Sequence, residues 1–327
     1  MKRRAFITLV GGVAAWSLQA RGQPAKRMRR VGVLWHAGSA EQEAPYFASL
    51  LEGFKSLGYV DGQNIKYEHR FPNEIPERFK IMGAELVSSE IDVLVVVGNN
   101  AAPYANNLTT TIPVVFTLVG DPVGLKLVAS LARPGGNVTG LASFAAELIP
   151  KRLELLKDIV PGLSRVALLA NMNAAITPLY VELSQAAAAR LGLTIQTFEI
   201  RSPDELETAF DAMAKAGMQG LTTNADGLGF THRAVIAKFA QARRLPLAAF
   251  SRESLEPGAL MSYGVDNIAI CRRTAVYVDK ILRGATPAEL PVEQPTKFEF
   301  LINLKTANAL DIKISPTLLS RADEVIE

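Results

Sequence analysis

The chain alternates short apolar runs rich in β-branched residues with amphipathic segments, and this alternation constrains its fold more than any other feature. The run at 91–97 is apolar on both faces, as in a strand that lies inside a parallel sheet with helices on either side. After the first run, at 30–35, apolar residues recur at helical spacing: Phe47, Leu50, Leu51, Phe54 and Leu57. This order predicts βαβ units.

The alternation occurs in two similar series. The first predicts strands at 64–70, 91–97, 113–118 and 138–142 after the run at 30–35, with helices at 76–89, 101–108 and 122–132. The second predicts strands at 165–170, 194–200, 219–223, 247–250 and 259–263, with helices at 177–191, 203–215 and 231–243. The first and third strands are 60 residues apart in one series, counted from 31 to 91, and 54 in the other, counted from 165 to 219. We therefore predict a two-lobed α/β protein that uses one architecture twice.

The N-terminus pairs Arg3 and Arg4 with an apolar stretch that runs to Leu18 and is followed by Ala20 and Gly22. Basic residues, a short apolar stretch and a small-residue exit, in this order, are typical of a cleaved secretory signal peptide, and the stretch is too short to span a bilayer. We predict that residues 1–22 are removed and that the mature protein is periplasmic. The arginine pair fits the Tat route, but a basic pair also serves the Sec route.

Removal of this segment changes the charge of the protein. It leaves 31 Lys and Arg residues against 32 Asp and Glu residues, so the formal net charge falls from +3 to −1. This balance argues against a nucleic-acid partner. Cys271 is the only cysteine of the chain, which excludes an intrachain disulfide and a multi-cysteine metal site. With 49% hydrophobic residues, the chain has enough apolar side chains for the cores of two lobes.

Open parallel sheets bind ligands beyond the carboxyl ends of their strands, so the residues that follow each predicted strand are the candidate ligand contacts. They combine amides, small residues, single charges and an aromatic ring, a mixture that suits a small polar molecule held between two lobes. The candidates are Trp35, His36, Asn99, Asn100, Ala101, Asp121, Asn173, Asn224, Asp226, Arg252 and Asp266.

Signatures of common enzyme classes are missing from the sequence. It contains no G-x-S-x-G elbow, no G-x-x-x-x-G-K-[ST] loop, no G-x-G-x-x-G after the first strand, no H-E-x-x-H and no C-x-x-C. The glycine-rich segment 134–140 precedes a strand rather than a helix, which favours a turn over a phosphate-binding loop. His69 shares a strand face with Ile65 and Tyr67, and we expect it to be structural. We predict no catalytic residue, cofactor or metal.

Five segments carry a resemblance to a known family. They are T-L-V-G-D-P-V-G at 117–124, L-A-R-P-G-G-N-V-T-G at 131–140, K-R-L-E-L-L at 151–156, P-T-K-F-E at 295–299 and I-N-L-K at 302–305. With them the mature chain resembles the ABC transporter substrate-binding proteins, the family that includes tryptophan- and tyrosine-type members. The resemblance implies a type I periplasmic binding fold, in which two doubly wound parallel-sheet lobes joined by a hinge close over a ligand.

The resemblance also implies three chain crossings, with lobe 1 at 31–143 plus 266–292 and lobe 2 at 144–265 plus 293–327. Residues 98–101 match the family's ligand loop between strand and helix, and residues 263–266 match a position near the hinge. Asn99 and Asp266 are then expected to contact one ligand from opposite ends of the cleft.

Several candidates have a structural alternative. Asp121 and Asp266 each precede a segment that a side-chain carboxylate can cap, and Asn173 can shape a turn together with Asn171. Arg252 can pair with Glu253 or Glu256 on the surface, and Trp35 can belong to the core. Asp226 and Asp266 are the preferred ligand contacts, because an acid beside amides suits an ammonium group.

The function expected from these observations is a periplasmic solute receptor. It would be a monomer that delivers a small polar, amino-acid-like molecule to an ABC permease. A ligand sensor of the same fold that signals to a membrane receptor is an alternative, and an exported enzyme is disfavoured by the missing motifs. A repressor effector domain shares this architecture, but the export signal and the absence of a preceding DNA-binding helix pair argue against it.

Overall fold

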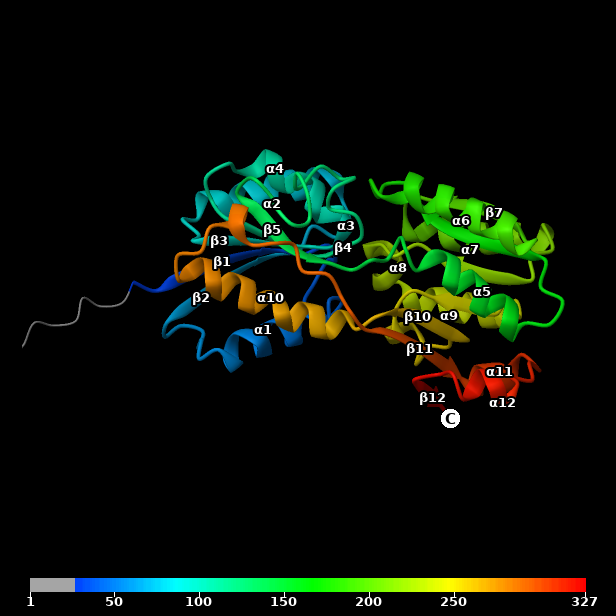
Figure 1. Ribbon diagram of the computed structural model, residues 1–327. Helices are drawn as coiled ribbons and strands as arrows, with labels where there is room; N and C mark the ends of the chain where they lie inside the picture. Colours follow the sequence, from blue (N-terminus) through cyan, green and yellow to red (C-terminus); the bar gives the residue numbers. More distant parts are fainter. Residues whose placement is uncertain (1–26) are drawn as a thin grey trace, which may run out of the picture.

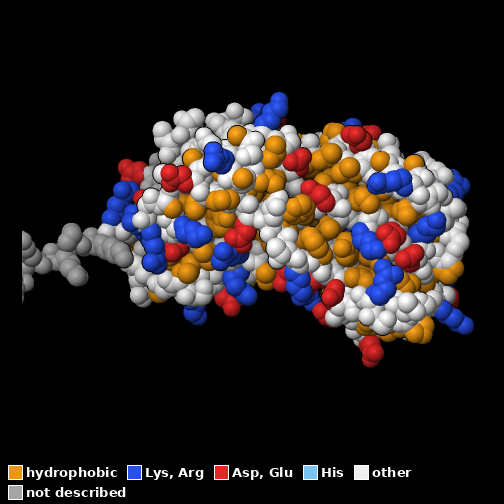
Figure 2. Space-filling model, viewed as in Figure 1, with side chains coloured by type: hydrophobic (Ala, Val, Ile, Leu, Met, Phe, Trp, Pro, Cys, Tyr) orange, Lys and Arg blue, Asp and Glu red, His pale blue; other side chains and the backbone are white. Residues whose placement is uncertain are grey.

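The computed structural model describes residues 27–327, and the predicted signal peptide at 1–22 lies outside this range. Two α/β lobes stand side by side and confirm the fold class predicted from the alternation (Figure 1). No helix within the described residues is long and apolar enough to cross a membrane. On the face shown in Figure 2, acidic and basic side chains are interspersed.

The first lobe contains a parallel sheet of order β2-β1-β3-β4-β5. Alternate residues of β3 belong to separate cores on the two faces of the sheet, which is why this run is apolar throughout. Its strands are β1 (Arg29–Leu34), β2 (Ile65–Arg70), β3 (Val93–Val97), β4 (Val114–Val119) and β5 (Val138–Ala142). Its helices are α1 (Tyr46–Ser56), α2 (Pro76–Ser88), α3 (Gly98–Ala101), α4 (Ala105–Leu108) and α10 (Asn267–Leu282).

The second lobe contains a sheet of order β12-β11-β10-β9-β8-β6-β7. Its first five strands in chain order repeat the arrangement of the first lobe, and β11 then adds antiparallel to β10. The strands are β6 (Arg165–Asn171), β7 (Thr194–Ile200), β8 (Gly220–Thr223), β9 (Leu247–Ala249), β10 (Met261–Val265), β11 (Phe298–Asn303) and β12 (Glu324–Ile326). The helices are α5 (Ile149–Ile159), α6 (Thr177–Leu191), α7 (Leu206–Lys215), α8 (Gly227–Thr231), α9 (Arg233–Ala242), α11 (Leu304–Ala309) and α12 (Pro316–Leu319).

Helix α10 ties the C-terminal part of the chain to the first lobe. It follows β10 of the second sheet but packs along α1, and the chain then returns to the second sheet as β11 (Figure 1). Gly53 permits the close approach of the two helices: a Cβ there would overlap the backbone carbonyl of Arg272 and lie 3.0 Å from the Cβ of Ala275. The chain thus passes between the lobes three times, after β5, after β10 and before β11.

One predicted helix is wrong. Residues 122–132 form successive turns, in which Oδ1 of Asp121 accepts a hydrogen bond from the backbone N–H of Gly124 at 2.8 Å. Lys126 adopts a left-handed backbone conformation with φ of 57°, which a continuous right-handed helix does not contain.

Candidate functional site

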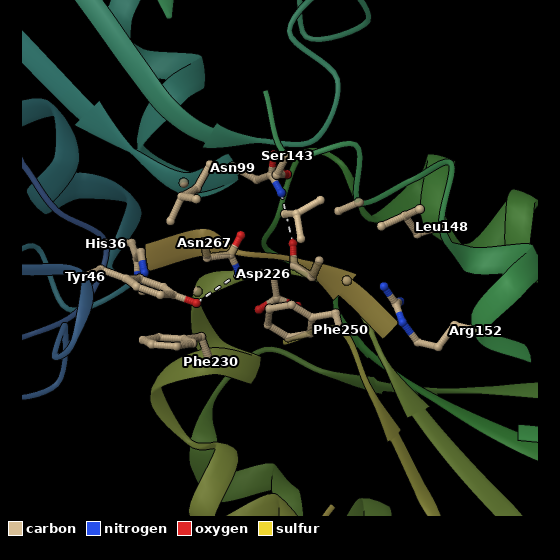
Figure 3. A pocket seen from close by; sticks show the side chains of 17 residues that line it. His36, Tyr46, Asn99, Ser143, Leu148, Arg152, Asp226, Phe230, Phe250 and Asn267 are labelled. Carbon is tan, nitrogen blue, oxygen red and sulfur yellow. Dashed lines mark hydrogen bonds between the residues drawn. The ribbon is translucent and has the colours of Figure 1, made fainter. Parts of the chain in front are cut away.

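A cavity lies between the two lobes, at the carboxyl ends of the strands. It contains about 520 Å³ of empty space, part of it open to solvent, which is within the range of small-molecule sites. The residues that line it are His36, Tyr46, Gly98, Asn99, Leu118, Ser143, Ala145, Leu148, Arg152, Ala225, Asp226, Gly227, Phe230, Phe250, Gly264, Val265 and Asn267 (Figure 3). In the first lobe, His36 and Asn99 follow β1 and β3, where the strand order reverses and such sheets bind ligands.

His36 is held between two carboxylates of its own lobe. Its Nδ1 lies 2.9 Å from Oε1 of Glu74, and its Nε2 lies 3.3 Å from Oε2 of Glu43. Glu43 is fully buried and accepts hydrogen bonds from the backbone N–H groups of His36 and Ala37 at 3.0 and 2.8 Å. Burial lowers the pKa of His36, but the two carboxylates outweigh this effect and raise it to about 9. His36 is therefore a cation at neutral pH, and its charge is balanced within the protein.

Asn99 connects the lobes. Its Oδ1 accepts a hydrogen bond from the backbone N–H of Gly120 at 2.8 Å. Its Nδ2 donates across the interface to the carbonyl of Ala225 at 2.9 Å and to the hydroxyl of Tyr180 at 3.4 Å. The structure thus shows the lobes closed upon each other at this point.

Asp226 contributes a buried carboxylate from the second lobe. It is the N-cap of α8, where Oδ1 accepts a hydrogen bond from the backbone N–H of Gly229 at 3.0 Å, and Nδ2 of Asn171 lies 3.4 Å from the same oxygen. Burial raises the pKa of Asp226 to about 7, and the negative charge of Glu74 across the interface adds to the rise. A cationic group placed beside this carboxylate would favour its charged form.

Aromatic rings form part of the cavity wall. Tyr46 of α1 stacks on Phe230 of α8 with ring centroids 4.4 Å apart, and Phe250, which follows β9, lies between Phe230 and Arg152 in the view of Figure 3. The hydroxyl of Tyr46 accepts a hydrogen bond from Nδ2 of Asn267 at 3.0 Å and lies 3.3 Å from Oε2 of Glu253. The three rings thus give the cavity an apolar wall to which both lobes contribute side chains.

Arg152 enters the cavity from α5, on the side opposite His36 in Figure 3. Its Nε and Nη2 donate to the backbone carbonyl of Tyr263 at 3.2 and 3.1 Å. Burial lowers its pKa to about 10, so the guanidinium remains protonated at neutral pH.

Of the eleven candidates predicted from strand ends, the structure brings His36, Asn99 and Asp226 together at the cavity. Asn100 lies just behind them, where its Nδ2 donates to Glu74.

Three further candidates are buried in the protein interior and do not line the cavity. Trp35 is fully buried and donates from Nε1 to Nδ1 of His69 at 3.1 Å, which also gives His69 its structural role. Ala101 packs in the core on the other face of the first sheet. Asn224 lines a separate, smaller hollow together with Tyr180, and its Nδ2 is 3.4 Å from Oγ1 of Thr177.

The remaining four candidates also lie outside the cavity, and each has a polar partner elsewhere. Asp121 caps the turn at Gly124, and Asn173 shapes a turn through Oδ1 of Asn171 and donates to the carbonyl of Arg201. Arg252 pairs with Glu299 and Glu324 rather than with its sequence neighbours. Asp266 is the N-cap of α10, where it accepts from the backbone N–H of Ala269 at 2.9 Å, and it faces a separate hollow near the hinge. The expectation that Asp266 and Asn99 share one ligand therefore needs correction.

Strand-end reasoning missed the cavity residues that helices supply: Tyr46, Arg152, Phe230 and Asn267. Arg152 had a signal, because it lies within the segment 151–156 that carries the family resemblance. Among residues 27–327 no group of three or more His, Cys, Asp or Glu side chains is arranged to hold a metal ion.

Comparisons with known proteins agree with this architecture. The family model described as ABC transporter substrate binding protein matches residues 44–326. The tyrosine-binding protein of Clostridioides difficile (strain R20291) is 27% identical over 293 residues, which are 88% of this chain and 82% of that protein.

Two solved structures share both the fold and sequence similarity. A conserved domain protein from Vibrio cholerae is 28% identical with a TM-score of 0.85, and the match covers 91% of this chain and all of that one. The ABC domain from Streptococcus pneumoniae in complex with L-Trp is 25% identical with a TM-score of 0.84 and the same coverage. The match of the family model over most of the chain, on two α/β lobes with a cavity between them, shows that this chain belongs to the family of ABC transporter substrate-binding proteins.

Proposed function

We propose that this protein captures an α-amino acid with an aromatic or large apolar side chain in the periplasm and, as a monomer, delivers it to an ABC permease. The cavity carries this proposal, because it combines an aromatic wall formed by Tyr46, Phe230 and Phe250 with the buried carboxylate of Asp226. The wall suits an apolar side chain, and the carboxylate suits an ammonium group. Relatives described as a tyrosine-binding protein and as a complex with L-Trp support the same ligand class.

The proposal predicts that L-tryptophan, L-tyrosine or L-phenylalanine binds the mature protein with a Kd near the micromolar range, equivalent to about −8 kcal/mol. A thermal-shift screen with these amino acids, aliphatic amino acids, sugars and dicarboxylates tests the class, because a ligand that binds only the folded state raises Tm. Calorimetry then gives the affinity. Stabilisation by sugars alone, or by none of these compounds, would contradict the proposal.

Asp226→Asn tests the ammonium contact in the same assay. Asn also caps helices well, so the N-cap of α8 is retained while the charge is lost. We expect about 10- to 100-fold weaker binding of the amino acid, and no comparable loss for its desamino analogue, such as indole-3-propionate for L-tryptophan. Asp121→Asn is the matched control, because Asp121 also accepts a backbone N–H bond but lies outside the cavity.

The periplasmic location rests on the signal peptide proposed at residues 1–22. N-terminal sequencing of the protein from a periplasmic fraction should give a start near Gln23. Changing Arg3 and Arg4 to Lys should block export by the Tat route and leave export by the Sec route nearly intact. Periplasmic protein that retains Met1 would contradict cleavage.

A further inference from the structure

Arg152 is a buried cation without a counter-ion among residues 27–327. Its exposed fraction is 2%, and its two hydrogen bonds from Nε and Nη2 both go to the carbonyl oxygen of Tyr263. No carboxylate of the described chain forms an ion pair with it, and Nη1 has no acceptor there. A charge removed from water without a partner is unfavourable by several kcal/mol, and one neutral carbonyl offsets only part of this cost.

His36, the other basic residue that lines the cavity, differs from Arg152 in this respect. The positive charge of His36 is balanced by Glu43 and Glu74, and Asp226 lies between His36 and Arg152 in the view of Figure 3. The carboxylates thus lie at or toward the end of the cavity formed by His36, whereas the unpaired positive charge of Arg152 lies at the opposite end. A ligand with a positive and a negative group meets complementary charges only in one orientation.

We propose that Arg152 binds the carboxylate of the ligand, with the ammonium group directed toward Asp226. The guanidinium fork matches carboxylate geometry, and Leu148, Ala145 and Phe250 line the same cavity with apolar surface that strengthens such a pair. Arg152 also holds the carbonyl of Tyr263, the middle residue of β10, the strand after which the chain changes lobes. This inference rests on the amino-acid ligand proposed above.

The first test uses wild-type protein and three probes: L-tryptophan, its neutral carboxamide L-tryptophanamide, and tryptamine, which has no carboxyl group. L-tyrosine, L-tyrosinamide and tyramine form the corresponding set if tyrosine binds more tightly. Calorimetry should show about 10- to 100-fold weaker binding of the amide and the amine than of the amino acid. Equal affinity of all three probes would overturn the role of Arg152 while leaving the amino-acid pocket intact.

The second test asks whether Arg152 is the source of this preference. In Arg152→Gln the affinity for the amino acid should fall to that of its amide, so that the ratio of the two Kd values approaches one. If Arg152 had only a structural role, Arg152→Gln would bind the amino acid and its amide more weakly by the same factor, and the ratio of their Kd values would stay that of wild type. Arg165→Gln is the matched control, because Arg165 is an exposed arginine at the start of β6 in the same lobe, outside the cavity, and its ratio should equal that of wild type.

Arg152→Lys keeps the proposal testable if Arg152→Gln does not fold, as judged by thermal unfolding. Lysine retains the charge but cannot form a bidentate pair with a carboxylate. We therefore expect the Kd of the amide divided by that of the amino acid to be smaller than in wild type. A ratio unchanged in the folded variants would overturn the inference. Failure of wild-type protein to bind any of the amino acids would instead overturn the proposed ligand class, and this inference with it.

Discussion

The charged residues of the cavity are of two kinds: those whose charge is balanced within the protein and those whose charge is available to a ligand. His36 belongs to the first kind, because two carboxylates of its own lobe surround it. Its position just after β1 predicts a ligand contact, and it does line the cavity. Its electrostatic surroundings show an additional role, since the ion pairs connect the segment after β1 to the loop that carries Glu43 and to the loop before α2 that carries Glu74.

This ion-pair cluster predicts a pH-dependent stability. In the unfolded chain His36 loses its proton near its ordinary pKa of 6.5, whereas in the folded protein it keeps it to about 9. The contribution of the protonated His36 to the free energy of unfolding is therefore fully present below pH 6.5 and is lost as the pH rises through 9. We expect the free energy of unfolding to fall by about 2 kcal/mol more in wild type than in His36→Gln between pH 7 and 10.

Urea unfolding followed by circular dichroism at several pH values measures this difference. His232→Gln is the control, because burial lowers the pKa of His232, and a lowered histidine pKa affects stability on the acid side rather than above pH 7. Identical slopes for wild type and His36→Gln would show that the cluster does not hold the proton.

Elements of secondary structure were largely predictable wherever a local pattern determined them. All ten predicted strands exist, with ends that differ by at most a few residues from the predictions. Strands such as β3 are apolar runs buried on both faces, whereas β2 and β7 are partly exposed and alternate apolar with polar residues; both patterns favour a strand. Helices α2 and α6 begin where Pro76 and Pro178 fit the first helical turn, and α6 ends at Gly192 in a left-handed conformation. The helix predicted at 122–132 does not form, because the side chain of Asp121 caps a turn and Lys126 adopts a left-handed conformation there.

Elements that depend on long-range pairing were less predictable. The alternation did not indicate that β11 would add antiparallel to β10, or that β12 would pair with β11, because the pairing of these strands is specified by their neighbours in the sheet. The same limit applies to the site. Strand-end positions correctly pointed to the edge where the cavity lies, but they do not distinguish a ligand contact from a cap such as Asp266 or a core ring such as Trp35.

The whole molecule is closed, with side chains of one lobe touching the other. Gly227, the first residue of α8 in the second lobe, faces His36 and Glu74 of the first lobe. A Cβ at this position would overlap Oε1 of Glu74 and lie 2.7 Å from Nδ1 of His36. Glu74 has little freedom to move away, because it also bonds to Asn100. A glycine is thus required here by the closed arrangement rather than by its own backbone conformation.

Gly227→Ala is therefore expected to hinder closure without disturbing either lobe. Overpacking of this kind typically costs about 1 to 3 kcal/mol, so the affinity for the amino-acid ligand should fall about tenfold or more. The stability of the ligand-free protein should not fall, because alanine suits a helix start and the clash arises only between lobes. Small-angle X-ray scattering with saturating ligand should give a larger radius of gyration than wild type. Gly136→Ala is the control, because a Cβ there meets no atom within 4 Å. Normal affinity and a normal ligand-bound radius in Gly227→Ala would mean that ligand binding does not require the lobes to meet at this glycine.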